Sequence, residues 1–339
     1  MKQEKAALRR QMKFIPPYCP NEACAHHIPS KSGVKFYRSK GWANTVAPPY
    51  AMRRFRCVGC KKTFSYSSFK LDYRNKKKGL NHRIFELFIC GSSNRQIGRV
   101  IGYSERLVRD RLKKMAQWSL VRHNELIRDV KISEPIAYDG LENFAYSQYD
   151  PNHIQQCVGS KSLFIYDFNF APLNRKGRMS DRQKIVREQL EAQFGRYQPR
   201  AIRIATREII KRIYAKWDQS VGSMVLLSDE HFQYKRAVKR DLKDLKIQHA
   251  TISSKETRNY QNILFPVNHS DLLIRQHVGA FSRETICFSK TAPRMIQKFA
   301  LFMVWKNFFR SLFVKEHVKR PEATVRTPAM ELEIGRAHV

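Results

Sequence analysis

Residues 55–64 read Phe55-Arg56-Cys57-Val58-Gly59-Cys60-Lys61-Lys62-Thr63-Phe64. Two residues separate the cysteines, and the aromatic residues on either side favour strands. A second pair, Cys19 and Cys24, lies about 30 residues earlier, which leaves room for a small antiparallel sheet. Four thiolates brought together by two tight turns are typical ligands of a structural Zn²⁺ ion. The spacing therefore predicts a zinc ribbon with Cys19, Cys24, Cys57 and Cys60 as ligands.

Two alternatives to this zinc site remain open. The first pair encloses four residues instead of two, so His26 or His27 could replace one sulfur. The cysteines could also form disulfides, although the charged N-terminus lacks the apolar run of a secretory signal. The absence of such a signal predicts a cytoplasmic protein.

The net charge of the chain is +35 over 339 residues, and basic residues are spread along its whole length. Such a charge favours a polyanionic partner, because binding releases the partner's counterions and relieves self-repulsion. A membrane-spanning segment is not expected. The most apolar stretch, residues 299–313, contains Lys306 and Arg310 and has the character of a core helix.

A helix-turn-helix is predicted within residues 92–109. Ser93 and Gln96 have the spacing of a capping box that opens a short helix, Gly102 supplies a tight turn, and Ser104 caps the next helix. We expect six apolar side chains to face inward: Ile97, Val100, Ile101, Leu107, Val108 and Leu112. The basic residues of the segment are the predicted DNA contacts: Arg95, Arg106, Arg109, Arg111 and Lys113. The second helix would enter the major groove, whereas the alternative is a plain helical hairpin.

Beyond residue 131 the pattern predicts an α/β domain. Strands are expected over 134–139, 143–148, 163–170, 224–229 and 247–252. Helices are expected over 178–217, from the end of the fourth of these strands to residue 245, and over about 270–283 and 292–315.

Asp139 and Asp229 are the leading catalytic candidates. Each directly follows an apolar run that predicts a buried strand, in a chain where acids are scarce. Carboxylates are the hard oxygen ligands that Mg²⁺ or Mn²⁺ prefers, and phosphodiester chemistry uses two such ions ~3.5–4 Å apart. A strand-end turn former or a helix cap is the structural alternative for each residue. We predict that both acids bind metal.

The third acid is harder to assign. Asp271 is expected in the first turn of a helix that flanks the sheet, and Glu284 is the alternative. The two differ by about 220° and roughly 20 Å on a continuous helix, so both cannot serve one metal pair. We prefer Asp271, whose structural alternative is a capping box closed by Asn268. Arg275, one turn later, is predicted to hold a phosphate or to orient Asp271.

A family resemblance joins these parts. The segment Arg275-Gln276-His277-Val278-Gly279-Ala280-Phe281-Ser282-Arg283-Glu284-Thr285-Ile286-Cys287-Phe288-Ser289-Lys290 resembles the C-terminal signature of bacterial insertion-sequence-one-type transposases. The run Asp139-Gly140-Leu141-Glu142-Asn143-Phe144 is similar to the Asp-x-Leu-x-x-Phe pattern that opens their nuclease domain. The order of ribbon, helix-turn-helix and nuclease also matches, over residues 15–315.

The resemblance implies a ribonuclease-H-like fold, two metal ions and DNA strand cleavage followed by strand transfer. It further implies double-stranded DNA at the element's ends and target as partner, a homo-oligomer, and a bacterial, nucleoid-associated protein. The family's third acid is usually a Glu at the position of Asn268, which leaves Asp271 as the substitute.

We therefore expect an α+β multidomain protein. Its predicted parts are a zinc ribbon (1–72), a helix-turn-helix domain (73–130), a nuclease domain (131–318) and a disordered tail (319–339). The final residues, 333–339, are similar to the translation of a common sequencing-adapter read, which predicts a non-native end; an ordinary disordered end is the alternative. The rival functions are a catalytically inactive DNA-binding regulator derived from a transposase and a structural RNA-binding protein.

Overall fold

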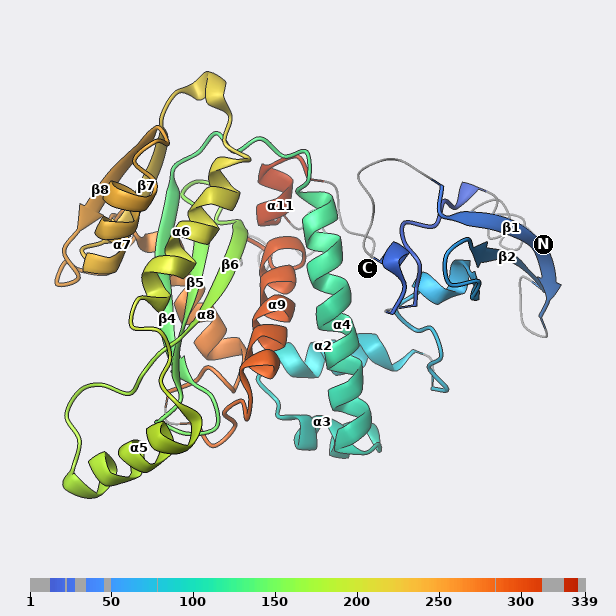
Figure 1. Cartoon of the computed structure of the whole chain (residues 1–339), viewed down its shortest axis with the longest axis horizontal. Coiled ribbons are helices and arrows are strands. Elements are labelled where there is room, and N and C mark those ends of the chain that lie inside the picture. The colour runs from blue at the N-terminus through green and yellow to red at the C-terminus, as the bar shows by residue number, and fades with distance from the viewer. Residues whose placement is uncertain are drawn as a thin grey trace, which may run out of the picture. The chain divides into compact units, whose positions relative to one another are not determined.

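A mixed five-stranded sheet is the centre of the larger part of this chain, as a computed structural model describes it (Figure 1). Its strands are β4 (Ile136–Phe144), β5 (Pro151–Gly159), β6 (Ile165–Pro172), β7 (Met224–Asp229) and β8 (Ile247–Ile252). They lie in the order β6-β5-β4-β7-β8. Strand β5 is antiparallel to its neighbours β4 and β6, and β7 and β8 run parallel to β4.

The structure describes residues 13–21, 23–27, 35–45, 50–77, 79–283, 285–312 and 326–334. The chain divides into two compact units, Met1–Leu80 and Asn81–Val339. We predicted a separate helix-turn-helix domain, but its helices belong to the same unit as the sheet. In the part of the chain described, no helix is long and apolar enough to cross a bilayer.

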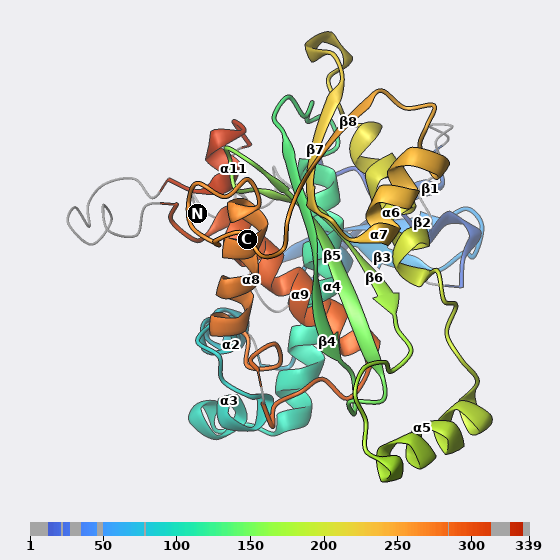
Figure 2. The same cartoon turned by 90° about the vertical axis from the view of Figure 1, so that its left-hand side faces the viewer.

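Helices cover both faces of the sheet (Figure 2). On one side lie α6 (Ala201–Tyr214) and α7 (Phe232–Arg236), followed by a π-helical turn, Ala237–Asp241. On the other lie α8 (Phe265–His277) and α9 (Ala292–Phe308). The long helix α4 (Glu105–Leu126) packs on α9.

Successive side chains of a strand point alternately to the helices on one face of the sheet and to those on the other. Tyr138 reaches α6, where its hydroxyl donates to Thr206 Oγ1 at 2.8 Å. Residues of the opposite parity face α8 and α9, as the contact between Phe168 and Phe299 shows, with ring centroids 4.6 Å apart. Since successive side chains of a strand point to opposite faces, Asp139 lies on the α8 side.

Two sheet elements differ from the sequence prediction. We predicted a strand over 143–148, but β4 ends at Phe144 and a turn follows. Strand β5 was missed, because four of its buried side chains are polar: Asn152, His153, Gln155 and Gln156. Strands β7 and β8 have the predicted bounds, and β6 is displaced by two residues.

Helix α8 begins at Phe265, five residues before the predicted start. Pro266 stands in its first turn, where the missing N–H group costs no hydrogen bond. Asp271 therefore lies in the second turn and not in the first. Asn268 is inside the helix, so the capping box that we considered for Asn268 is absent. Glu284 lies outside the described residues.

The first unit contains a three-stranded antiparallel sheet of β1 (Tyr37–Asn44), β2 (Ala51–Cys57) and β3 (Thr63–Ser65), with β2 in the middle. Two 3₁₀ turns flank it, η1 (Ala25–His27) and η2 (Tyr66–Phe69). One face of this sheet packs aromatic side chains against the cysteines in a small core.

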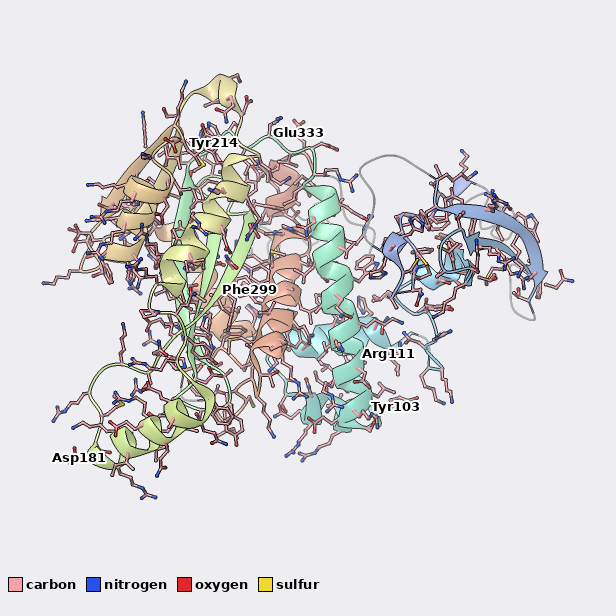
Figure 3. The ribbon with its side chains drawn as sticks, viewed as in Figure 1. Tyr103, Arg111, Asp181, Tyr214, Phe299 and Glu333 are labelled. Atoms are coloured by element: carbon pink, nitrogen blue, oxygen red, sulfur yellow. The ribbon has the colours of Figure 1, made fainter. Side chains whose placement is uncertain are left out.

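Between the two sheets in the sequence lie the helices α2 (Leu80–Ile89), α3 (Asn94–Ile101) and α4. A helix between β6 and α6, α5 (Asp181–Phe194), has no buried residue; Figure 3 places Asp181 at the end remote from the sheet. Near the C-terminus, α11 (Pro328–Glu331) packs on α9, and Ala329 is 1% exposed. The predicted disorder is therefore wrong for residues 326–334.

Candidate functional site

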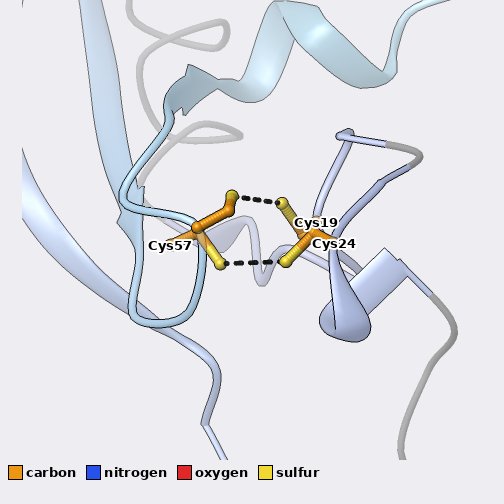
Figure 4. A group of neighbouring side chains, drawn as sticks. Cys19, Cys24 and Cys57 are labelled. Atoms are coloured by element: carbon orange, nitrogen blue, oxygen red, sulfur yellow. Dashed lines mark hydrogen bonds between the residues drawn. The ribbon is translucent and has the colours of Figure 1, made fainter.

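Four cysteines of the first unit point toward one another from two loops (Figure 4). The sulfur atoms of Cys19, Cys24, Cys57 and Cys60 all lie within 4.8 Å of one another. The closest approaches are 3.6 Å between Cys19 and Cys60 and 3.7 Å between Cys24 and Cys57. A disulfide needs about 2.05 Å, whereas ligands on a tetrahedral zinc with ~2.3 Å bonds stand roughly 3.8 Å apart. The cluster could bind zinc, and the disulfide alternative is wrong.

The histidines near this cluster have other partners. His27 donates from Nδ1 to the backbone oxygen of Cys19 at 2.9 Å, and His26 stacks on Phe36. Gly59 lies so close to the His26 ring that an added Cβ would stand 2.9 Å from Cδ2. Burial raises the pKa of Cys19 to about 12, so a bound cation would have to hold that thiol as a thiolate.

Asp139 and Asp229 are brought together by the register of two parallel strands. Tyr138 of β4 is paired with Ser228 of β7, so the next residue of each strand is an aspartate. Neighbouring strands lie about 4.8 Å apart, and residues at the same level share a face. The Asp139 carboxylate accepts from the Gly140 backbone at 2.7 Å, and Asp229 accepts from the backbone of His231 at 3.0 Å.

Asp271 joins this face through a side chain that sequence reasoning missed. Gln156 stands directly opposite Asp139 in the β4–β5 pair, and α8 packs on both strands. The amide nitrogen of Gln156 donates to Asp271, and its oxygen accepts from Ser270 Oγ at 2.8 Å. Gln156 and Ser270 are fully buried. The sequence did not indicate a role for Gln156, because the strand that contains it was not predicted.

Neighbouring acids raise the pKa values of Asp139 and Asp271. Burial, and next the charge of Asp229, raises the pKa of Asp139 to about 6. Burial, and next the charge of Asp139, raises the pKa of Asp271 to about 8. The cations Arg275 and Arg258 act in the opposite direction on Asp271. The exposed Arg258, in the loop after β8, is a second residue that the sequence did not indicate.

The three acids are less tightly gathered than the cysteines. Across the described ranges, the cysteine cluster is the only group of three or more metal-ligating side chains whose ligand atoms all lie within 4.8 Å. All three side chains carry carboxylate oxygens, which are the ligands that Mg²⁺ and Mn²⁺ prefer.

The helix-turn-helix capping predictions are confirmed. Ser93 and Gln96 form the capping box of α3, and Ser104 Oγ accepts from the backbone of Leu107 at 3.3 Å. Gly102 adopts φ 72°, the left-handed conformation of the turn. An added Cβ at Gly98 would stand 2.6 Å from the Tyr103 carbonyl, so glycine permits the close approach of α3 and α4.

Most predicted DNA contacts of this segment lie on its surface. The side chains of Arg95 and Arg106 are 75% and 83% exposed, that of Arg109 is 39% exposed, and Lys113 is exposed. The predicted DNA contact at Arg111 is wrong. This residue is only 7% exposed, and it donates a hydrogen bond to Asn81 Oδ1 of α2 at 3.2 Å. Figure 3 labels Arg111 on α4.

The predicted apolar stripe also needs a correction at Val100. Ile97 and Val108 are fully buried, as predicted, and Leu112 is 7% exposed. Val100, in contrast, is 61% exposed. The short helix α3 presents only one narrow face to α4, and Val100 lies outside that face.

The signature segment 275–290 connects the helices to the sheet. His277, at the end of α8, donates from Nδ1 to the Ile89 carbonyl of α2 at 3.0 Å. Asn143 of β4 donates to the Ala280 carbonyl at 3.3 Å. Arg275, predicted to touch a phosphate or orient Asp271, is half-buried and donates to the Phe281 carbonyl at 3.3 Å. The segment thus holds α2, α8 and β4 together.

Comparison with known proteins adds no identification. No protein-family model matches the chain, and no curated protein is similar to it.

Proposed function

We propose that this protein is a DNA transposase that binds the ends of a mobile element, cleaves DNA strands and transfers them to a target. The observation that carries the proposal is the juxtaposition of Asp139 and Asp229 at one level of β4 and β7. Asp271 approaches the same face through Gln156. Two acids on one face of a sheet and a third on the helix that packs there, in a chain with a net charge of +35, favour metal-dependent chemistry on a polyanion.

In this proposal the carboxylates of Asp139, Asp229 and Asp271 hold Mg²⁺ or Mn²⁺. Bound divalent metal would supply Lewis acidity and charge neutralisation for phosphodiester cleavage. Gln156 keeps one oxygen of Asp271 occupied by a hydrogen bond, which orients the carboxylate toward Asp139. Arg258 contributes positive charge at the same place, where a DNA phosphate would lie.

The other parts of the chain are compatible with this function. The mixed sheet with helices on both faces agrees with the ribonuclease-H-like class that the resemblance implies. The exposed arginines of α3 and α4 would read an element end, and zinc held by the cysteines would stabilise the ribbon. Cleavage at two ends of an element requires two active sites, so we propose that copies of the chain assemble on DNA.

An inactive DNA-binding regulator is the second candidate. Two observations favour it: Asn268 stands where the family has its third acid, and in the described part of the chain the three aspartates do not form a tight cluster. This candidate keeps the cysteine site and the helix-turn-helix surface but has no catalytic metal.

Nicking of a supercoiled plasmid separates the two candidates. The transposase proposal expects nicking that requires Mg²⁺ and falls at least about 100-fold in Asp139→Asn and in Asp229→Asn. Asp241→Asn serves as a matched control, because Asp241 pairs with Arg203 on the α6 side of the sheet. Nicking at equal rates by the wild type and both active-site variants would refute the metal assignment.

A further inference from the structure

The sheet of the first unit has one face that does not pack on the cysteine core. Arg38 of β1, Arg56 of β2 and Thr63 of β3 lie at the same level of the sheet and therefore share a face. Arg54 stands two residues from Arg56 on the same face, and Lys40 reaches Thr63 Oγ1 at 3.2 Å. We call Arg38, Lys40, Arg54 and Arg56 the basic face.

The opposite face accounts for the folding of this sheet. Phe55 is fully buried, Cys57 is 1% exposed and Phe64 is 6% exposed, all on the side of the four cysteines. Arg38, Lys40 and Arg56 are exposed. The cations of the basic face therefore contribute nothing to the hydrophobic core that stabilises the unit.

In the part of the first unit that the structure describes, acids do not balance these cations. Among the residues of the first unit that the structure describes, Asp72 is the only acid, against 13 lysines and arginines. Arg38 and Arg56 stand directly opposite each other on neighbouring strands, and like charges in such a pair destabilise a sheet. The arrangement is unfavourable for folding, so folding alone does not explain it.

Protection of an exposed strand edge explains only part of the pattern. Charged residues on edge strands prevent sheets from pairing with other chains, and β1 is an edge strand. Strand β2, however, is the central strand, so Arg54 and Arg56 protect no edge. The Nε atom of Arg54 is also buried without a hydrogen-bond partner. A ligand with acceptor oxygens would complement the exposed cations of this face.

We propose that the basic face binds the phosphate backbone of duplex DNA without reading its sequence. Guanidinium groups match phosphate oxygens in bidentate geometry, and such contacts fix position without specifying bases. The site is separate from the arginines of α3 and α4 and from the three aspartates. It rests on the proposed function only in the choice of duplex DNA as the polyanion.

The test measures DNA binding by the full-length, zinc-loaded chain without magnesium. Fluorescence anisotropy of a labelled duplex of random sequence would be recorded from 50 to 300 mM salt for Arg38→Thr/Arg56→Thr. The control is Lys70→Thr/Arg74→Asn, which removes the same charge from the same unit outside the sheet; asparagine tolerates the left-handed backbone of position 74, where φ is 59°. Each lost phosphate contact reduces the salt slope by about 0.9, so we expect a reduction of roughly 1.8 and roughly ten-fold weaker binding.

Stability gives a second readout that a merely structural role would not produce. The basic-face variant should melt at an equal or higher temperature than the wild type, because a like-charge pair is removed, while the control should leave the salt slope almost unchanged. Equal losses of slope in the two variants would overturn the proposal. A lost slope for structured RNA but not for DNA would also overturn it.

The result of this DNA-binding test does not depend on nuclease activity. If the proposed nuclease activity fails, plasmid nicking disappears while the salt slope of duplex binding still separates the basic-face variant from its control. If the basic face has no role, Asp139→Asn still abolishes nicking while the two charge variants bind alike.

Discussion

Asp139 and Asp229 stand side by side on parallel strands, one residue beyond the paired Tyr138 and Ser228. Because both strands place their aspartate at the same level, both residues lie on the same face of the sheet, on which α8 packs against β4 and β5. The arrangement brings like charges together in a partly buried place, and it raises the pKa of Asp139 to about 6. Such a pair opposes folding and favours a cation, which is the physical basis of the proposed metal site.

Gln156→Leu should impair catalysis through Asp271. The substitution keeps the volume but removes the donor to the Asp271 carboxylate. Loss of a residue that orients a metal ligand costs about 10–100-fold in metal affinity or activity. We expect a higher Mg²⁺ concentration for half-maximal nicking, measured by titrating Mg²⁺ in the plasmid assay.

Gln155→Leu is the matched control. Gln155 is the neighbouring buried glutamine, but it faces α6 and donates to the Ile202 carbonyl at 3.1 Å. Its loss should lower stability without changing the Mg²⁺ requirement. If both variants shift the requirement equally, Gln156 has no special role in orienting Asp271.

Asp271→Asn should stabilise the protein at alkaline pH. The pKa of Asp271 is about 8 in the folded chain, above its ordinary value of 3.8. The folded state therefore holds this proton more tightly than the unfolded chain, so its contribution is greatest below pH 4 and is lost as pH rises to about 8. The difference in melting temperature between Asp271→Asn and the wild type should grow from pH 6 to pH 8.5.

Magnesium should stabilise the wild type at alkaline pH, where the Asp271 carboxyl is ionised. Adding Mg²⁺ at pH 8.5 should raise the melting temperature of the wild type, because the cation binds the ionised folded state. The Asp271→Asn variant should respond less. A constant difference between the two proteins across this pH range would show that the Asp271 carboxyl is not perturbed.

Zinc removal should unfold the first unit. Its core is small and built around Cys19, Cys24 and Cys57, and structural zinc supplies folding energy in such units. Cys57→Ser should lower the zinc content measured by atomic absorption and expose the remaining thiols to a thiol reagent. Cys157→Ser, in the large sheet, should leave the zinc content unchanged; a zinc content independent of Cys57 would contradict the assignment.

Arg111 and Arg106 should behave differently although both lie on α4. Arg111→Ala removes a buried contact with Asn81 and should cost about 2 kcal/mol of stability, measured by denaturant unfolding. Arg106→Ala should change stability by less than about 0.5 kcal/mol, since its pair with Asp110 is exposed and 3.9 Å long. Arg106→Ala should instead change the salt slope of duplex binding. Equal stability losses in the two variants would show that Arg111 contributes no more to folding than Arg106.

The sequence predicted those features that local rules determine. Capping residues such as Ser93 and Ser104 act within one helical turn, and apolar strands such as 224–229 are visible as runs. The cysteine cluster was also predictable, because two short spacings bring four ligands together. These signals need no knowledge of the tertiary structure.

Long-range packing explains what the sequence did not reveal. Strand β5 is buried on both faces but polar, since Gln155 and Gln156 find partners on helices far away in the chain. The burial of Arg111 likewise depends on α2. No periodicity in one segment could have indicated these contacts. The start of α8 is a different case, because Pro266 in the first helical turn is a local signal that the sequence prediction did not use.

In the proposed mechanism Asp139, Asp229 and Asp271 hold divalent cations in one site. Anomalous diffraction from crystals soaked in Mn²⁺ measures this most directly. We predict a manganese peak in contact with both Asp139 and Asp229, absent from Asp139→Asn crystals that retain zinc at the cysteines. Manganese density elsewhere only, or carboxylates of Asp139 and Asp229 more than ~10 Å apart, would contradict it.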